Sequence, residues 1–179
     1  MGVATALFSP RALSRAPHLS TFVTVGNATQ PFDRLLRAVT DISAELPHPI
    51  VVQRGTSTIS HRDWDSHEFI EMVQFERLVK QSAVLIMHAG AGSVINAVRA
   101  GRMPIVMPRR ATNREHVDEH QLEFATALAS LGYVVLARDA SELHSAVRRA
   151  PRSRGTRGAA PTELVEHISQ LLARLALAS

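Results

Sequence analysis

The sequence predicts an α/β protein with a Rossmann-like, doubly wound parallel sheet of about six strands. Short runs rich in β-branched residues alternate with longer amphipathic segments from Thr21 onward, which is typical of repeated strand–helix units. The run from Ala83 to Met87 is apolar throughout, as expected for a strand buried on both faces of a parallel sheet. Glycine and proline stand between these segments, where the chain must turn.

The size and composition of the chain suit one intracellular domain. Its 179 residues are enough for a single substantial core. It contains no cysteine, which excludes disulfides and thiolate metal sites and favours a reducing cytoplasm. No apolar run reaches the roughly 18 residues that a membrane-spanning helix needs. Residues 1–20 hold two arginines and no acid, and we interpret them as a flexible extension, or as the result of a misplaced start site, before a domain at residues 21–150.

Strands are predicted where short apolar or β-branched runs end at a glycine, a proline or a polar loop. The first run ends at Gly26, and the second lies between Pro49 and Gly55. The final run follows Gly132. The six predicted strands span residues 21–25, 50–53, 67–70, 83–87, 104–107 and 134–137.

Helices are predicted from apolar side chains spaced three and four residues apart, together with start and stop signals at their ends. Proline is favoured in the first turn, serine and aspartate as N-caps, and glycine just after the last turn. In order, the predicted helices are 31–46 after Pro31, 72–80, a helix capped by Ser93 and stopped by Gly101, a helix that ends at Gly132, and one opened by a capping box of Asp139 and Glu142.

The stretch 82–108, SAVLIMHAGAGSVINAVRAGRMPIVMP, organises the chain, because it reads as strand, glycine turn, helix and strand. A helix N-terminus behind glycines attracts anions, since its unpaired N–H groups and the positive end of its dipole point at the same place. We therefore expect a phosphate group above Gly92. His88, Gly26 and the loop 109–121 follow strands too, so they belong at the same ligand-binding edge. The alternative is a crossover that only packs and binds nothing.

Positive charge is concentrated towards the two ends of the chain. The formal net charge is +4, with +2 in residues 1–20 and +5 in residues 148–158, which leaves −3 for the remainder. A slightly acidic body with one Trp and one Tyr argues against binding to nucleic acid. We interpret residues 151–160 as an Arg/Gly/Pro linker that is either solvated or touches anionic lipid headgroups. Residues 161–179 then form an amphipathic helix, whose apolar stripe packs either on its own sheet or on a partner.

Motifs of several other functions are absent or weak. The turn after the first strand, TVGNATQPF, has one glycine instead of GxGxxG, which disfavours a nicotinamide or flavin enzyme. Asp63 and Asp65 form a pair that suits a divalent metal, yet they lie in a polar loop, so surface acids are the preferred interpretation. His116 and His120 have the i, i+4 spacing of metal ligands on a helix. A site that binds the hydroxyl groups of a ligand is at least as good an interpretation.

Three stretches together resemble the C-terminal domain of glycosyltransferase family 28. They are TVGNATQPFDRLLRAV at 24–39, HAGAGSVINAVRAGRMPIVMP at 88–108 and EHVDEHQLEFATAL at 115–128, and the likeness spans about residues 21–150. The chain is especially similar to short, split members, such as the cytosolic subunit of the transferase acting on dolichol-linked GlcNAc and small bacterial exopolysaccharide glycosyltransferase subunits. The resemblance implies the nucleotide-sugar-binding half of a GT-B enzyme, whose acceptor-binding half is a separate membrane-anchored chain.

The resemblance also implies roles for individual residues. The second glycine turn, residues 89–93, would hold the diphosphate of the sugar donor. Phe69 and Ile70 would contact the nucleotide base largely through their backbone, and the 118–121 segment would bind sugar hydroxyls. A UDP-sugar enters as substrate, with no cofactor and no metal. The expected donor-binding residues are Gly26, Asn27, Phe69, Ile70, His88, Ala89, Gly90, Ala91, Gly92, Ser93, Asn96, Asp118, His120 and Gln121.

These features favour the donor-binding subunit of an inverting, metal-independent glycosyltransferase. It would transfer a hexose or N-acetylhexosamine from a UDP-sugar to a lipid-linked acceptor in polysaccharide or glycolipid synthesis. No residue is convincing as the general base, so we expect the base to come from the membrane-anchored partner, in a heterodimer at the cytoplasmic membrane.

Two alternatives stay open. Asn96 stands where many family members carry a ribose-binding glutamate, which favours a non-catalytic subunit of the same fold that has lost donor binding. A nucleotide-sugar epimerase is the weaker alternative, since such enzymes keep both halves in one chain.

Overall fold

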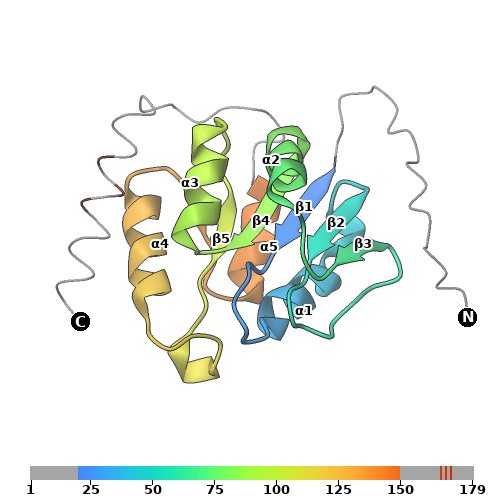
Figure 1. The fold of residues 1–179 in the computed structure, drawn as a ribbon, viewed down its shortest axis with the longest axis horizontal. Helices are drawn as coiled ribbons and strands as arrows, with labels where there is room; N and C mark the ends of the chain where they lie inside the picture. The colour runs from blue at the N-terminus through green and yellow to red at the C-terminus, as the bar shows by residue number, and fades with distance from the viewer. Residues whose placement is uncertain (1–19, 150–165, 167, 169, 171–179) are drawn as a thin grey trace, which may run out of the picture.

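The computed structural model describes residues 20–149, 166, 168 and 170, and these residues build a parallel sheet with helices on both faces (Figure 1). The six strands are β1 Thr21–Thr24, β2 Ile50–Gln53, β3 Trp64–His67, β4 Val84–His88, β5 Ile105–Met107 and β6 Val135–Leu136. The helices are α1 Asp33–Asp41, α2 Met72–Gln81, α3 Ala91–Arg99, α4 His120–Ser130 and α5 Ala140–Arg149, with two short 3-10 turns, η1 Ser43–Glu45 and η2 Ala111–Asn113.

The order of the strands places the two glycine turns side by side. Across the sheet the order is β3-β2-β1-β4-β5-β6, and every pair of neighbours is parallel. The chain therefore winds outward from β1 to one edge, returns to place β4 next to β1, and winds outward again on the other side. Ligands of doubly wound sheets bind at this reversal point, outside the carboxyl ends of the strands. The predicted α/β fold class and the six-stranded sheet are confirmed.

Alternate side chains of each strand face two separate apolar layers. Val23 of β1 and Ile86 of β4 belong to the layer covered by α1 and α5, whereas Phe22 and Leu85 belong to the layer covered by α2, α3 and α4. In the second layer, the rings of Phe22 and Phe75 meet edge to face with their centroids 5.3 Å apart. Because both faces are covered, the central strands carry continuous apolar runs, as the sequence predicted.

The third strand lies three residues earlier than predicted. Residues 67–70 were expected to form it, but β3 runs from Trp64 to His67, paired with β2 from Ile50 to Gln53. The reason is that β3 is an edge strand, where only Trp64 is buried, so it has no apolar run to mark it. Phe69 and Ile70, which looked like strand residues, instead lead into α2.

Helix ends differ from the prediction at one important place. Helix α3 begins at Ala91, directly after Gly90, so Ser93 lies inside its first turn and does not cap it. Gly101 takes the left-handed conformation, with φ +71°, that was predicted to stop this helix. The predicted cap of the last helix is present: Oδ1 of Asp139 accepts the Glu142 amide at 2.8 Å, and Oε2 of Glu142 accepts the Arg138 amide at 2.8 Å.

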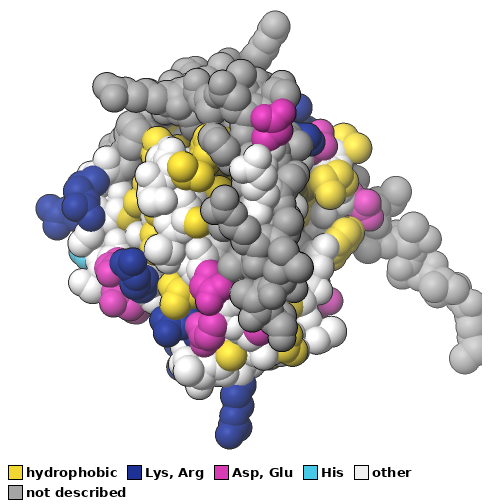
Figure 2. Space-filling view, turned by 90° about the vertical axis from the view of Figure 1, so that its left-hand side faces the viewer, with side chains coloured by type: hydrophobic (Ala, Val, Ile, Leu, Met, Phe, Trp, Pro, Cys, Tyr) yellow, Lys and Arg dark blue, Asp and Glu magenta, His cyan; other side chains and the backbone are white. Residues whose placement is uncertain are grey.

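Two of the predicted segments lie outside the described residues: the N-terminal extension, apart from Ser20, and the linker at 151–160. Of the final helix, only Glu166, Ile168 and Gln170 are described, and Ile168 belongs to the apolar layer under α2, α3 and α4. Within the described part of the chain, every helix is too short or too polar to cross a membrane. On the face shown in Figure 2, acidic and basic side chains are interspersed, and neither sign forms a continuous field.

Candidate functional site

A cleft of about 260 Å³ opens at the carboxyl edge of the sheet, where the strand order reverses between β1 and β4. The ends of β1 and β2 form its floor, and the first turns of α2 and α3 form its two walls. Its lining residues are Thr24, Gly26, Asn27 and Gln53 on the floor; Phe69, Ile70, Glu71, Met72 and Phe75 on one wall; and Gly92, Ser93 and Asn96 on the other.

The wall formed by α3 carries the unpaired amide groups of a helix N-terminus. The first intrahelical bond joins the Val94 amide to the Gly90 carbonyl at 3.1 Å, so the amides of Ala91, Gly92 and Ser93 have no partner within the helix. A Cβ added at Gly92 would have no atom within 4 Å, which means that this position faces open space. The cleft therefore offers N–H donors and a positive helix end to an anion.

His88, the last residue of β4, lies packed between the two glycine turns. A Cβ added at Gly26 or at Gly90 would overlap Nε2 of its imidazole. Only glycine fits at these two positions while the imidazole keeps its place, and Gly26 additionally adopts φ +78°, where side chains are strained. The glycines of the two turns thus make room for a buried histidine at the reversal point of the sheet.

The imidazole of His88 is neutral at physiological pH. Burial, followed by the positive charge of Arg109, lowers the pKa of His88 to about 4. Its Nδ1 is buried and has no hydrogen-bond partner among the described residues. His88 can therefore act at this edge only as a neutral donor or acceptor, and it brings no positive charge to an anion.

The second wall of the cleft is more apolar. Phe69 is 56% exposed and Met72 is 63% exposed, while Ile70 and Phe75 are buried behind them. Glu71 directly precedes α2, so the N-terminus of a second helix also points at the cleft. An apolar wall opposite a polar one suits a ligand with a flat, partly apolar group and an anionic group.

Beyond the cleft, the loop after β5 is fixed by a buried arginine. The Arg109 side chain is fully buried, and its guanidinium donates to the carbonyls of Val25 at 2.8 Å, Gln30 at 2.9 Å and Glu115 at 3.0 Å. It also lies over the ring of Phe32, with 4.7 Å from Cζ to the centroid. Burial lowers the pKa of Arg109 to about 10, so the group stays charged at neutral pH. Arg109 therefore ties the loop after β1 to the loop after β5.

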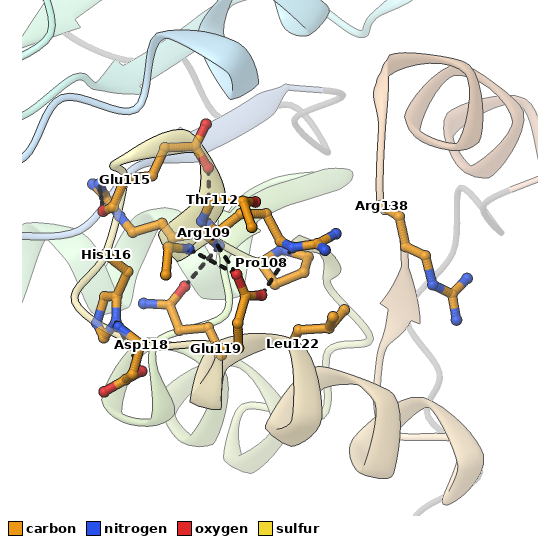
Figure 3. A network of polar contacts seen from close by, with 12 residues as sticks. Pro108, Arg109, Thr112, Glu115, His116, Asp118, Glu119, Leu122 and Arg138 are labelled. Atoms are coloured by element: carbon orange, nitrogen blue, oxygen red, sulfur yellow. Dashed lines mark hydrogen bonds and ion pairs between the residues drawn. The ribbon is translucent and has the colours of Figure 1, made fainter.

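Two glutamates hold the rest of this loop, as Figure 3 shows. Glu115 accepts two hydrogen bonds from Arg34, each 2.9 Å long, and one from the Arg110 amide at 3.0 Å. Glu119 accepts from the Ala111 amide and from Nε of Arg110, both at 2.9 Å. Charge-assisted bonds of this kind are stronger than neutral ones, and they fix the segment that leads into α4.

Asp118 forms the centre of a small polar group at the start of α4. Its carboxylate lies 3.0 Å from Nδ1 of His116 and 3.1 Å from Nδ1 of His120, and it accepts the His120 amide at 3.0 Å. Burial alone raises the pKa of Asp118, but the His120 amide and the two imidazoles outweigh this effect, and the pKa lies below its usual value. An ionised Asp118 is thus an acceptor that is available at neutral pH.

The expectation that His116 and His120 share a helix face is wrong. His120 is the first residue of α4, whereas His116 lies in the loop before it. The Asp118 carboxylate accepts the His120 amide at the start of the helix, and the Glu119 carboxylate accepts the Ala111 amide in the loop. Among the described residues, no three His, Asp or Glu side chains are placed to hold a metal ion. Asp63 and Asp65 are exposed at the start of β3, and Asp65 lies 3.0 Å from Nε2 of His67.

The structure brings about half of the expected donor-binding residues into one cleft. Gly26, Asn27, Phe69, Ile70, Gly92, Ser93 and Asn96 line it. His88 and Ala89 are buried beside it, and Gly90 and Ala91 form the turn into α3. Asp118, His120 and Gln121 lie at the start of α4 and do not line this cleft. Gln121 is partly engaged, since its Oε1 accepts the Arg109 amide at 3.0 Å.

Sequence reasoning missed five residues that also line the cleft: Thr24, Gln53, Glu71, Met72 and Phe75. A signal was present for Gln53, the one polar residue at the end of the apolar strand Ile50–Gln53. Arg109 was missed as well, and only its position in the loop that follows β5 could have pointed to it.

Comparison with known proteins agrees with this geometry. A sequence profile of the glycosyltransferase family 28 C-terminal domain matches residues 20–172. Over 63 residues the chain is 43% identical to the UDP-N-acetylglucosamine transferase subunit ALG13 of Cryptococcus neoformans var. neoformans serotype D, strain JEC21. The aligned segment covers 35% of this chain and 30% of that protein, so the match spans less than a third of its length.

Solved structures resemble the chain in fold. The glycotransferase of kitacinnamycin superposes with a TM-score of 0.57 at 17% identity, over 99% of this chain and 44% of the other. The solution structure of ALG13 superposes with a TM-score of 0.54 at 20% identity, over 78% of this chain and 88% of the other. The chain thus has the fold of one part of a larger transferase and of nearly all of a small one.

Proposed function

The chain belongs to glycosyltransferase family 28, and from this premise we propose that it is the donor-binding subunit of an inverting UDP-sugar transferase. The observation that carries the proposal is the N-terminus of α3, whose free amides and open glycine face a cleft at the reversal point of the sheet. The ALG13 match adds support for a subunit that handles a UDP-linked N-acetylhexosamine, because that relative is a UDP-N-acetylglucosamine transferase subunit.

The two walls of the cleft suit the two ends of a nucleotide diphosphate. The amides of Gly92 and Ser93 would bind the diphosphate, and the apolar wall around Phe69 and Ile70 would contact the base. The sugar would extend towards α4, where Asp118 and His120 offer polar atoms for hydroxyl groups. Neither a metal nor a cofactor has a part in this proposal.

The chemistry that follows is electrostatic. An acceptor hydroxyl attacks the anomeric carbon as the bond to the diphosphate breaks, so negative charge grows on the leaving diphosphate. The amides at the N-terminus of α3 stabilise that charge without having to reorient, which lowers the barrier. Neutral His88 lies beneath the same turn, where it shapes the turn and does not neutralise the diphosphate.

The proposed subunit depends on a second chain. Among the described residues that line the cleft, Glu71 is the one titratable side chain, and it lies on the apolar wall and not on the α3 wall, so we assign no general base to this chain. We propose that a membrane-anchored partner subunit supplies the general base and binds the lipid-linked acceptor. This partner would cover the open carboxyl edge of the sheet, in a heterodimer on the cytoplasmic side of the membrane. The isolated chain should then bind donor and transfer little sugar.

The test is calorimetric titration of UDP and UDP-sugars into the purified chain. We expect binding at millimolar concentration or tighter, and its loss in Gly92→Asp, which places a carboxylate where the diphosphate would lie. Gly92→Ala is the control for folding, because a Cβ there meets no protein atom; since it adds no negative charge, it should lose less affinity than Gly92→Asp. Equal binding by the wild type and Gly92→Asp would contradict the proposed diphosphate site.

The second candidate is a non-catalytic subunit that keeps the fold without binding donor. Asn96 favours it, because this neutral side chain lines the cleft at a position where a carboxylate would grip ribose hydroxyls more strongly. If no nucleotide binds to the wild-type chain in the same titration, this second candidate replaces the first.

A further inference from the structure

Three polar side chains on the floor of the cleft form a continuous hydrogen-bond relay. The Gly26 amide donates to Oγ1 of Thr24 at 3.1 Å, and the Thr24 hydroxyl donates to Oε1 of Gln53 at 3.3 Å. Nε2 of Gln53 then donates to Oδ1 of Asn27 at 2.7 Å. Thr24 and Gln53 are buried, whereas Asn27 is exposed at the mouth of the cleft.

The hydrogen bonds of the relay all run in one direction, from the Gly26 amide to Asn27. The Gly26 N–H donates to one oxygen lone pair of Thr24, and the Thr24 hydroxyl hydrogen is left for Gln53. The carbonyl end of the Gln53 amide faces Thr24, and its NH2 end faces Asn27. Asn27 can meet an NH2 group only with its own oxygen. Its NH2 group is left over, and within the described residues it has no partner.

We propose that Gln53 is a positioning residue, which turns the amide of Asn27 so that its two N–H donors face an oxyanion of the ligand in the cleft. The inference rests on the proposed function, since the ligand considered is the diphosphate of a UDP-sugar. Asn27 on the floor and Gly92 and Ser93 on the α3 wall line the same cleft, so hydrogen-bond donors from both elements would hold the diphosphate.

The fixed direction matters because asparagine is ambiguous on its own. A free Asn27 side chain could turn either its carbonyl or its NH2 group to the ligand, and the carbonyl would repel a phosphate oxygen. Gln53 is almost fully buried, and its backbone carbonyl also accepts the Val25 amide at 3.0 Å, so its position is set by the sheet itself. The buried residue thus transmits a preferred orientation to the exposed one.

The experiment is a double-mutant cycle on UDP affinity, measured by calorimetry. Gln53→Met keeps the length of the side chain and removes its amide. Asn27→Ala removes the NH2 group that would donate hydrogen bonds to the diphosphate. We expect each variant to bind UDP about tenfold more weakly or worse, since a hydrogen bond to a charged group is lost. Because Gln53 acts through Asn27, the double variant should bind no more weakly than Asn27→Ala alone.

Two further variants keep the test sharp. Gln53→Glu has the same shape but only acceptors, so Asn27 must turn its NH2 group away from the ligand, and affinity should fall further than in Gln53→Met. Gln81→Met, at the far end of α2, is the matched control and should bind as the wild type does. Thermal unfolding of each variant verifies that the fold is kept.

Each outcome has a distinct meaning. Wild-type affinity in Gln53→Met, or the same loss from Gln53→Met with and without Asn27, overturns the positioning role and leaves the proposed function standing. If the wild type itself does not bind UDP, the proposed function and this inference both fall.

Discussion

At the scale of single residues, His88 makes a pH dependence expected. In the folded chain its pKa is about 4, whereas the ordinary value of 6.5 applies once the chain unfolds. Above pH 6.5 neither state binds the proton and His88 has no effect on the pH dependence. Below it the unfolded chain is protonated and the folded chain is not, so the free energy of unfolding falls until about pH 4.

The prediction is a loss of about 2 kcal/mol between pH 7.5 and pH 5 that depends on His88. Urea unfolding followed by circular dichroism at both pH values would measure it in the wild type and in His88→Gln, which cannot titrate. Each protein is compared with itself at two pH values, so any general destabilisation by the substitution cancels. An equal loss in both proteins would show that His88 is not the group responsible.

The sequence could indicate some residues of the cleft and not others. Gly92 and Ser93 were predictable, because a glycine turn between a buried strand and a helix has a known chemical meaning. The polarity of Gln53 at the end of an apolar strand was a signal, but its role and that of Arg109 were not predictable, since they depend on partners such as Asn27, 26 residues from Gln53, and Gln30, 79 residues from Arg109. A sequence shows that a residue is polar, but only the fold shows which carbonyl or amide it meets.

At the scale of elements, Arg109 joins two loops that no strand pairing connects. Its guanidinium satisfies the carbonyls of Val25 and Gln30 at the ends of the loop after β1, and that of Glu115 in the loop before α4. Both loops contribute expected donor-binding residues. The relative position of the first glycine turn and the 118–121 segment therefore depends on one side chain.

Arg109→Met should lower the free energy of unfolding by about 3 kcal/mol or more, because three carbonyl groups in or near the core lose their donor. Hydrogen exchange measured by mass spectrometry should rise in both 25–30 and 109–121. The neighbouring Arg110→Met is the control: its ion pair with Glu119 is partly exposed and is expected to contribute under about 1 kcal/mol. Faster exchange confined to 109–121 in Arg109→Met would contradict the role as a connection between loops.

The elements themselves followed from the sequence where they are buried. β1, β2 and β4 are apolar and bounded by glycine or proline, and their predicted positions agree with the structure to within about a residue or two. β3 was misplaced because an edge strand such as Trp64–His67 needs no apolar pattern to pair. The conformation of the loop before α4 was not predictable either. Its backbone amides donate to the carboxylates of Glu115 and Glu119, and the sequence shows no regular pattern for such bonds.

At the scale of the whole molecule, the sheet presents its carboxyl edge as an open surface. Phe69, Met72 and Val73 are exposed near one side of the cleft, and Val117 is exposed in the loop before α4. The glycotransferase of kitacinnamycin resembles this chain in fold over 44% of its own length. The sequence could predict the fold of this domain, but it carries no pattern that identifies the sugar or the acceptor.

Whether the C-terminal stripe belongs to this domain or to a partner can be decided at Ile168. Its side chain is 1% exposed and lies in the layer that includes Phe124 and Leu128 of α4. Ile168→Ala should therefore cost the isolated chain about 2–5 kcal/mol in unfolding free energy, the usual range for a buried isoleucine. Gln170→Ala, at an exposed position two residues on, should change it by no more than about 0.5 kcal/mol. A stripe that packs only on a partner would leave the stability of the isolated Ile168→Ala chain unchanged, so chemical unfolding without any partner separates the two arrangements.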